Sequence, residues 1–148
     1  GLVIEKVDGP SHLKVVEEFG YEMYMHCGAI RKVLLAWQTP AFIDEYFKNI
    51  ILHDQAFPHV RPDDLREELK KIRQDGYAIT HGEYVTDALG IGAPVFNSDG
   101  ELAGSIGIIA PEIRVDTPEF LDTQKDLVQF YASSLSADLG YEKHDVFQ

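Results

Sequence analysis

The chain has 148 residues, 45% hydrophobic and 26% charged, a composition typical of a folded domain with an apolar core rather than a disordered tail. Its 25 acidic and 13 basic residues give a net charge of −12, and so acidic a surface repels nucleic-acid phosphates at long range. No apolar run approaches the roughly 20 residues that a membrane helix needs, and no signal peptide is visible.

Two strands are predicted at the start of the chain. Leu2–Val7 ends at the turn-forming Asp8-Gly9-Pro10, and Leu13–Glu17 is expected to pair with it. Because a strand begins at residue 2, we expect earlier structure to precede this chain in the native protein. No repeat or internal linker is visible, so residues 1–148 are predicted to form one domain.

Helical spacing of apolar residues predicts four helices. Pro40 and Pro62 stand at first helical positions, where proline is tolerated, with Thr39 as the N-cap before Pro40. Gly76 and Gly140 supply the left-handed residue that ends a helix. The predicted helices are Gly28–Trp37, one that starts at Pro40 and carries its apolar stripe to Ile50, one from Pro62 to its cap at Gly76, and one from Pro118 to Leu139.

The strongest strand signal is a hairpin of Ala88–Phe96 and Glu101–Ala110, joined by Asn97-Ser98-Asp99-Gly100. Asn, Asp and Gly tolerate the positive φ that a tight reversal requires. With the turn centred on this joint, residues whose numbers sum to 197 face each other. One face is then branched and apolar, and we expect it to pack on helices. Its predicted pairs are Leu89 with Ile108, Ile91 with Ile106, Ala93 with Gly104, and Val95 with Leu102.

The opposite face of the hairpin is built from small residues. Glycine inside a strand gives nothing to pack and usually marks the close approach of a ligand or another backbone. A close helix–sheet contact or a bulge is one explanation for this face. A ligand pocket is the favoured explanation, because the hollow extends over three successive pairs. These predicted pairs are Ala88 with Ile109, Gly90 with Gly107, and Gly92 with Ser105.

Four blocks along the chain resemble a known family when taken in order. Met25–Ala36 (MHCGAIRKVLLA) is similar to a His-x-x-x-x-Gly-Lys-Ala-Leu-Leu-Ala run, and Leu65–Ala78 is similar to a helix that ends in Ile-Arg-x-x-Gly-Tyr-Ala. Residues 93–100 and 106–114 are similar to Ala-Pro-Val-Phe-Asp and Ser-Gly-Pro segments. Together the blocks resemble the effector-binding domain of the IclR family of bacterial transcription regulators, over nearly the whole chain.

The resemblance implies an α+β fold like that of GAF and PAS sensor domains, with a curved antiparallel sheet, flanking helices and a ligand cavity. It implies a winged helix-turn-helix DNA-binding domain upstream, absent from this chain, through which alone the protein would contact DNA. It also implies a homodimer or homotetramer and a small-molecule effector, often an organic or aromatic acid. The resemblance implies no membrane contact and no cofactor.

The resemblance also places the effector contacts. Four matching positions lie on the small face of the hairpin, which the turn predicts independently. The matching positions are Ala29, Ile30, Thr80, Ala88, Gly90, Gly107 and Ile109. Gly92 and Ser105 share that small face.

Three polar residues near the expected cavity, Tyr24, Arg31 and His81, are candidates to orient an anionic ligand. Arg31 lies in the first turn of a predicted helix, where backbone N–H groups also favour an anion. A surface salt bridge is an equally good reading of this arginine. The family's Gly-Lys is Arg31-Lys32 here, and the usual strand serines are Gly107 and Ile109. The loss of these hydroxyls favours a larger or more apolar ligand, such as an aromatic acid.

His26 and Cys27 are adjacent, which raises the alternative of a catalytic pair. Adjacent side chains on an extended strand point to opposite faces, so we expect a buried structural thiol and no enzyme activity. A single cysteine fits a reducing cytoplasm. The six histidines show no i, i+4 pair and are expected at the surface, although a loop could bring His53, Asp54 and His59 together around a metal.

The sequence therefore predicts a cytoplasmic ligand-sensing domain of an IclR-type transcriptional regulator. Two other classes stay open. One is a free-standing GAF-like domain that binds a small molecule or a partner, and the other is a small enzyme acting on the same ligand.

Overall fold

The computed structural model describes residues 1–11, 20, 22–53, 60–115 and 117–142. These residues form an α+β fold, which confirms the predicted class. Its elements are helices α1 (Ala29–Ala36), α2 (Pro40–Tyr46), α3 (Pro62–Asp75) and α4 (Pro118–Asp138), strands β1 (Ala78–His81), β2 (Ala88–Phe96) and β3 (Leu102–Pro111), a π-helical turn (Phe47–Ile51) and a 3-10 turn (Glu112–Arg114).

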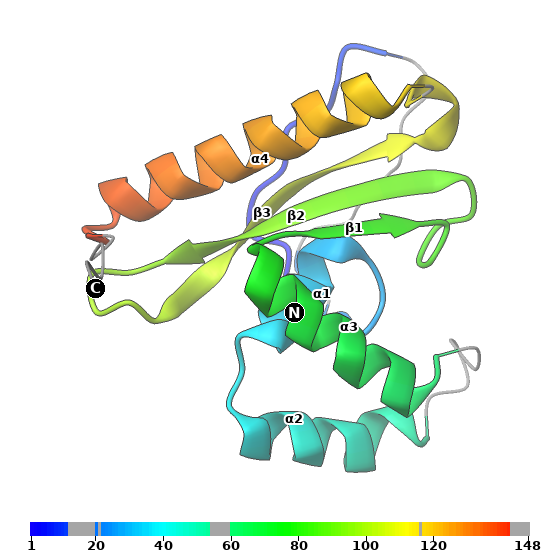
Figure 1. Ribbon diagram of the computed structural model, residues 1–148, viewed down its shortest axis with the longest axis vertical. Helices are drawn as coiled ribbons and strands as arrows, with labels where there is room; N and C mark the ends of the chain where they lie inside the picture. The colour runs from blue at the N-terminus through cyan, green and yellow to red at the C-terminus, as the bar shows by residue number, and fades with distance from the viewer. Residues whose placement is uncertain (12–19, 21, 54–59, 116, 143–148) are drawn as a thin grey trace.

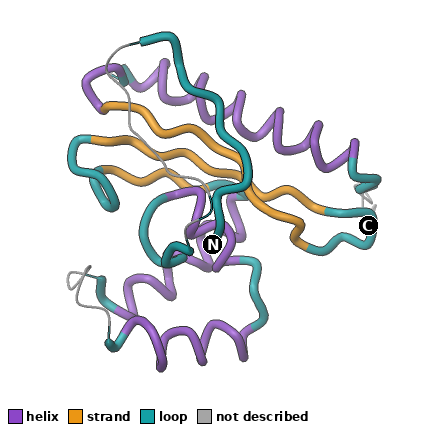
Figure 2. Tube along the Cα trace, turned by 180° about the vertical axis from the view of Figure 1, so that it is seen from behind, coloured by secondary structure: helices purple, strands orange, loops and turns teal. Residues whose placement is uncertain are grey.

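The three strands form one antiparallel sheet in the order β1-β2-β3. Helix α4 runs along one face of this sheet, and α1 packs against the other (Figure 1). Helix α3 contacts α1 on the side away from the sheet, and α2 lies beyond it, as the view from behind also shows (Figure 2). Helix α1 is therefore enclosed between the sheet and α3.

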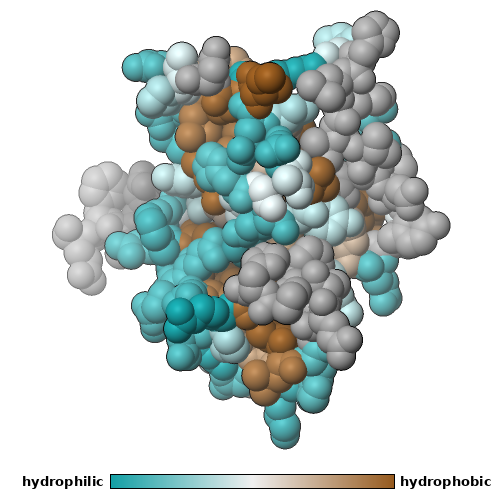
Figure 3. Space-filling view, turned by 90° about the vertical axis from the view of Figure 1, so that its right-hand side faces the viewer, coloured by the Kyte–Doolittle hydropathy of each residue, from teal (hydrophilic) through white to brown (hydrophobic). Residues whose placement is uncertain are grey.

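The apolar face predicted for the hairpin forms the core beneath α4. Leu89, Ile91, Ala93 and Val95 are buried there against Val128 and Ala132 of α4. A second core lies around α1, α3 and the π-helical turn. On the surface, brown apolar residues are interrupted by teal hydrophilic ones (Figure 3). Its buried members include Val33, Leu35, Phe47, Leu65, Leu69 and Ile72.

The register of the hairpin differs from the predicted one by two residues. Gly92 faces Gly107 and Ile91 faces Ile108, so facing numbers along most of the ladder sum to 199 and the predicted pairs were wrong. A shift by two residues leaves every side chain on its own face of the sheet. The predicted composition of each face is therefore correct, although the cross-strand partners are not.

The shift has two sources. The reversal is a loop of three residues, 98–100, closed by a 2.9 Å hydrogen bond from the Asn97 N–H to the Glu101 carbonyl. Gly100 has a φ of 77°, as the last residue of such a loop requires. A bulge between Val95 and Phe96 then offsets the two strands by one more residue.

The helix boundaries follow the predicted caps closely. The Thr39 hydroxyl accepts a 3.2 Å hydrogen bond from the Phe42 N–H, and Gly76 ends α3 at a φ of 79°. Beyond Tyr46 the predicted second helix widens into the π-helical turn, which carries Phe47 into the core. Thr117 is an additional N-cap, accepting from the Phe120 N–H at the start of α4.

The strand predictions outside the hairpin were less successful. Of the predicted strand Leu2–Val7, only Leu2 forms a bridge, to Glu22, so that prediction was wrong. The predicted partner strand at 13–17 lies outside the described residues. Strand β1 was not predicted, because four residues directly after a helix cap are too short for a clear alternation. No helix formed by the described residues is long and apolar enough to cross a membrane.

Candidate functional site

The small face of the hairpin packs directly against the start of α1. A Cβ added at Gly92 would lie 2.7 Å from the Cα of Ile30, and one at Gly107 would lie 2.6 Å from Ile30 Cγ1. At Gly90 it would meet Thr80 Oγ1 at 3.0 Å. Of the two explanations for this face, the structure contains the close helix–sheet contact.

Side chains from the sheet hold the start of α1 in place. The Ala29 N–H donates a 3.0 Å hydrogen bond to the buried Thr80 hydroxyl on β1, and the Ser105 hydroxyl on β3 donates a 2.8 Å bond to the Ile30 carbonyl. Gly28, the N-cap, has a φ of 86°, and its N–H donates to Glu83 Oε2 at 3.1 Å. An internal carboxylate thus lies at the positive end of the helix.

Glu83 also joins an ion cluster around the buried side chain of Lys32. Lys32 Nζ lies 2.6 Å from Glu83 Oε1 and 2.7 Å from Glu68 Oε2, and its side chain is 5% exposed. Glu68 comes from α3, whereas Glu83 comes from the loop between β1 and β2. Lys32 therefore links α1 to both, and stabilises the loop in its position over the start of the helix.

The structure brings most of the sequence-predicted site residues together around the start of α1. Ala88 and Ile109 lie at the far end of the β2–β3 ladder, where they pair with Pro111 and Gly90. The remaining members meet at the contact between α1 and the sheet, and these are Ala29, Ile30, Thr80, Gly90, Gly92, Ser105 and Gly107. Tyr24 and Arg31 line a separate pocket instead.

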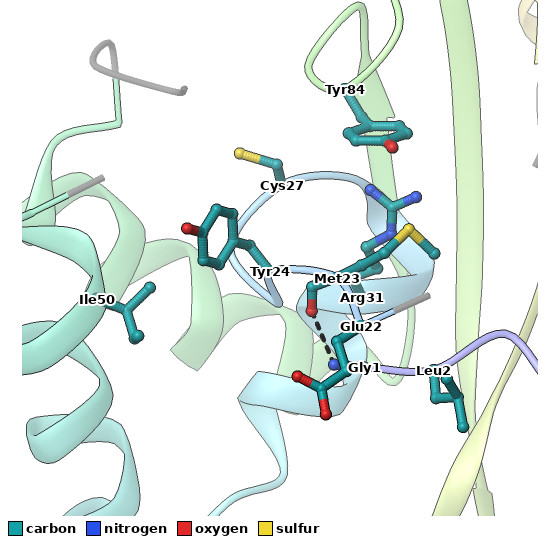
Figure 4. Close-up of a pocket in the computed structure, with 9 residues that line it drawn as sticks. All are labelled: Gly1, Leu2, Glu22, Met23, Tyr24, Cys27, Arg31, Ile50 and Tyr84. Carbon is teal, nitrogen blue, oxygen red and sulfur yellow. Dashed lines mark hydrogen bonds between the residues drawn. The ribbon is translucent and has the colours of Figure 1, made fainter. Parts of the chain in front are cut away.

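That pocket has a volume of about 810 Å³. Arg31, 8% exposed, sends its guanidinium over the ring of Tyr84, with 3.6 Å between Cζ and the ring centroid (Figure 4). This is the distance of a cation–π contact. The pocket is lined by Gly1, Leu2, Glu22, Met23, Tyr24, Cys27, Arg31, Ile50 and Tyr84.

Behind Tyr24 lies a buried polar network. His26 is fully buried, with its Nδ1 2.9 Å from the hydroxyl of Tyr46, and that hydroxyl accepts a 2.8 Å bond from the Met25 N–H. The ring of Tyr24 lies 5.2 Å from that of His26. These contacts fix the backbone that carries Tyr24 into the pocket.

The segment around His26 and Cys27 is a bend rather than the predicted extended backbone, so that premise was wrong. Cys27 is buried, as predicted, and it lies on the wall of the pocket. His81 is exposed and does not line the pocket. Its Nδ1 lies 3.1 Å from Glu112 Oε1. Among the described residues, no group of three or more potential ligands is arranged to hold a metal ion.

Sequence reasoning missed Tyr84 and Glu83. Both lie in the loop between β1 and β2, and without β1 this loop had no predicted position in space. The sequence signal for them is an acidic and an aromatic residue directly after Gly82. Gly82 has a φ of 61°, and this residue turns the chain back over α1.

Comparison with known proteins identifies close likeness in both sequence and fold. The family model for the C-terminal domain of the bacterial transcriptional regulator IclR matches residues 1–137. The HTH-type transcriptional regulator RhmR of Escherichia coli is 30% identical over 94% of this chain and 54% of its own length. KipR of Bacillus subtilis, also an HTH-type transcriptional regulator, is 26% identical over 95% of this chain and 56% of its own length.

The likeness extends to solved structures. The crystal structure of the Thermotoga maritima IclR superposes with a TM-score of 0.81 at 28% identity, covering 93% of this chain and 56% of that one. The chain thus spans about half the length of the relatives it matches.

Proposed function

Because the chain belongs to the IclR family of bacterial transcriptional regulators and matches its C-terminal domain, we propose that it senses a small organic acid and thereby controls DNA binding. The DNA contact would be made by a helix-turn-helix domain elsewhere in the full-length protein. Its relatives are named as transcriptional regulators, which supports a regulatory role rather than catalysis. We place the protein in the cytoplasm, where such regulators act.

The observation that carries the proposal is the buried Arg31 in a pocket large enough for a small organic molecule. A guanidinium presents parallel N–H donors that match a carboxylate, so it selects an acid over its neutral analogue. Stacking on Tyr84 holds the guanidinium plane in one orientation. Glu22 lies on the same wall, and it disfavours ligands with a second negative charge nearby.

The remaining lining favours a ligand with an apolar body. Tyr24 and Tyr84 contribute aromatic rings, and Leu2, Met23 and Ile50 contribute aliphatic surface. A flat, apolar body fits between such groups, and aromatic pairs prefer offset or edge-on contacts there. An aromatic carboxylate is the ligand class that satisfies both the guanidinium and the rings.

The residues at the α1–sheet contact provide the route from ligand to response. We propose that these residues respond to the effector through the packing of α1, because none of them lines the pocket. They are Ala29, Ile30, Thr80, Ala88, Gly90, Gly92, Ser105, Gly107 and Ile109. Arg31 follows Ile30 directly in the first turn of α1, and its side chain lines the pocket. A ligand bound to Arg31 favours a different packing of α1 against the glycines of the sheet. It thereby shifts the population between two arrangements of α1 and the sheet.

Thermal-shift and calorimetric binding measurements test the proposal. The ligands are benzoate, phenylacetate, glyoxylate and pyruvate, with benzamide as the neutral analogue. We expect an aromatic carboxylate to bind best, and Arg31→Gln to weaken its binding by about ten- to a hundredfold, the usual strength of a charged hydrogen bond. Arg73→Gln, at an exposed site on α3, is the matched control and should bind like the wild type.

Tyr84→Ala separates a binding effect from a folding effect, because this ring is partly exposed and its removal leaves the core intact. It should weaken binding without lowering the melting temperature of the free protein. Equal binding of benzamide and benzoate would exclude the role of Arg31. Tightest binding of glyoxylate or pyruvate would exclude the aromatic class, and consumption of a bound ligand in an NMR time course would favour an enzyme.

A further inference from the structure

The loop between β1 and β2, residues 82–87, lies between the pocket and solvent. It carries Tyr84 over the guanidinium of Arg31 (Figure 4). A Cβ added at Gly28 would lie 3.7 Å from Tyr84 Cβ, so the loop also passes directly over the turn that precedes α1. Tyr84 is nonetheless 43% exposed. The loop therefore forms one wall of the pocket and has its outer side in water.

Backbone hydrogen bonds fix the two ends of this loop. The Gly82 N–H donates to the Ala88 carbonyl at 2.8 Å, and the Glu112 N–H donates to the Asp87 carbonyl at 2.8 Å. The first and last residues of the loop both have a left-handed backbone, with a φ of 61° at Gly82 and 58° at Asp87. Hinges are usually a few residues of this kind at the ends of regular elements. The loop can therefore turn about two fixed ends.

Between its ends the loop is held to α1 through the side chain of Glu83. This carboxylate accepts a 3.1 Å hydrogen bond from the Gly28 N–H and lies 2.6 Å from Lys32 Nζ. On its other side, Lys32 Nζ donates to both oxygens of Glu68, at 2.8 and 2.7 Å. A buried ammonium left without a counter-charge is strongly destabilising. Because Glu68 stays in place, Lys32 keeps a carboxylate partner when Glu83 moves away, and the contact can open at low cost.

We propose that residues 82–87 are a lid that opens and closes over the pocket, and that Glu83 holds this lid closed. The inference rests on the proposed function, because the lid controls the entry and release of the ligand at that same pocket. In the closed state Tyr84 completes the wall beside Arg31 and retains the ligand there. In the open state this wall is removed, and the ligand exchanges with solvent.

A lid that must open for both entry and release has a characteristic effect on the rates of binding. Glu83 does not line the pocket, so its contacts with α1 are the same in the free and the bound protein. Weakening these contacts therefore speeds association and dissociation by the same factor and leaves the Kd unchanged. In a fixed wall, a substitution that weakens binding acts mainly on the dissociation rate. The two rates together distinguish a lid from a fixed wall.

Hydrogen exchange at the Gly28 amide tests the lid without any ligand. This N–H donates to Glu83, whereas the next one along the chain, that of Ala29, donates to Thr80 on β1. Glu83→Gln keeps an acceptor oxygen but removes the charge beside Lys32. It should speed exchange at Gly28 by about five- to tenfold, the usual loss when a charged hydrogen bond becomes neutral. Exchange at Ala29 should not change, because the start of α1 stays on the sheet.

Two further variants accompany this measurement. Glu67→Gln is the matched control, since it removes a glutamate–lysine pair from the exposed face of α3 and should change neither amide. Asp87→Gly frees the hinge without touching Glu83 and should also speed exchange at Gly28. Equal acceleration at Gly28 and Ala29 would indicate fraying of α1 and would overturn the lid. So would a Gly28 amide that exchanges only with global unfolding, as slowly and with the same urea dependence as the central amides of β2.

NMR exchange measurements with benzoate test the effect of the lid on binding. In Glu83→Gln we expect association and dissociation both to become about five- to tenfold faster, with a Kd within about twofold of the wild type. Unchanged rates at normal benzoate affinity would overturn the lid and leave the proposed function in place. If neither benzoate nor the other acids bind, the proposed function fails instead, and the exchange of the Gly28 amide alone decides whether the loop opens.

Discussion

Gly92 and Ile30 approach so closely that a Cβ on the glycine would lie 2.7 Å from the Cα of the isoleucine. The contact joins the centre of β2 to the first turn of α1. Since backbone atoms occupy the space on both sides, neither partner can move aside by a change of rotamer. The seating of α1 on the sheet thus depends on the absence of a single methyl group.

Gly92→Ala should therefore lower the free energy of unfolding by about 1–3 kcal/mol, the usual cost of overpacking. Gly104→Ala is the control on the neighbouring strand, where an added Cβ meets no heavy atom within 4 Å. That substitution should be neutral, or slightly stabilising because alanine loses less backbone entropy on folding. Urea denaturation measures both. Equal stability of the two variants would contradict the close contact.

Thr80→Val tests the hydrogen bond from the Ala29 N–H to the Thr80 hydroxyl, which supports the same contact. The substitution keeps the shape of the side chain but leaves the buried Ala29 N–H without its acceptor. A buried donor without a partner costs about 1–3 kcal/mol. Hydrogen exchange at the Ala29 amide should become faster than in the wild type. Thr86→Val, at an exposed position of the β1–β2 loop, should leave that amide unchanged.

Lys32→Met should destabilise the protein more than Glu68→Gln. Removing the lysine leaves two carboxylates facing each other, Glu68 and Glu83, with no cation between them. Both carboxylates are partly exposed, so the cost should be about 2 kcal/mol, below that of breaking a fully buried pair. Glu68→Gln leaves the Lys32–Glu83 pair intact and should cost less than about 1 kcal/mol. Urea denaturation at low and high salt distinguishes the two.

The Lys71–Asp75 pair on α3 predicts a local pH dependence. The hydrogen bond to the Asp75 carboxylate raises the pKa of Lys71 above its ordinary value of 10.5. A raised pKa in the folded state means that the pair contributes its full stabilisation below the ordinary lysine pKa. This contribution is lost as the pH rises through the folded-state pKa.

An NMR titration of the Lys71 side chain measures this pKa directly. Asp75→Asn should return it toward the ordinary value, because the amide cannot stabilise the ammonium as a carboxylate does. Asp63→Asn, at the other end of α3, should leave the Lys71 titration unchanged. An unchanged pKa in Asp75→Asn would show that the pair does not form in solution.

Much of the fold follows from short-range patterns in the sequence. Proline at a first helical position and glycine in the left-handed cap place the ends of α3 within a residue or two, because both depend on local backbone sterics alone. Strand alternation assigns Leu89 and Ile91 to one face of the sheet, whatever the register. The two-residue error in pairing came from a three-residue loop and a bulge, whose geometry depends on φ angles at single positions.

The candidate site was predictable only in part. Arg31 and Tyr24 were found by their chemistry and their closeness to the first predicted helix, and both lie on the pocket wall. Tyr84 was missed because its position depends on β1 and on the loop that follows it. The four sequence blocks that resemble the family identify the type of domain, but they do not predict the position of the loop between β1 and β2.

The glycines of the hairpin show what the sequence predicts about this sheet and what only the structure reveals. The residue pattern alone predicts that β2 and β3 pair, that one face is branched and apolar, and that the other carries small residues at its centre. What packs against the small residues follows only from the three-dimensional arrangement of the elements. A ligand and a helix backbone need the same missing Cβ, so glycine alone cannot distinguish them, and here the start of α1 lies on Gly92 and Gly107.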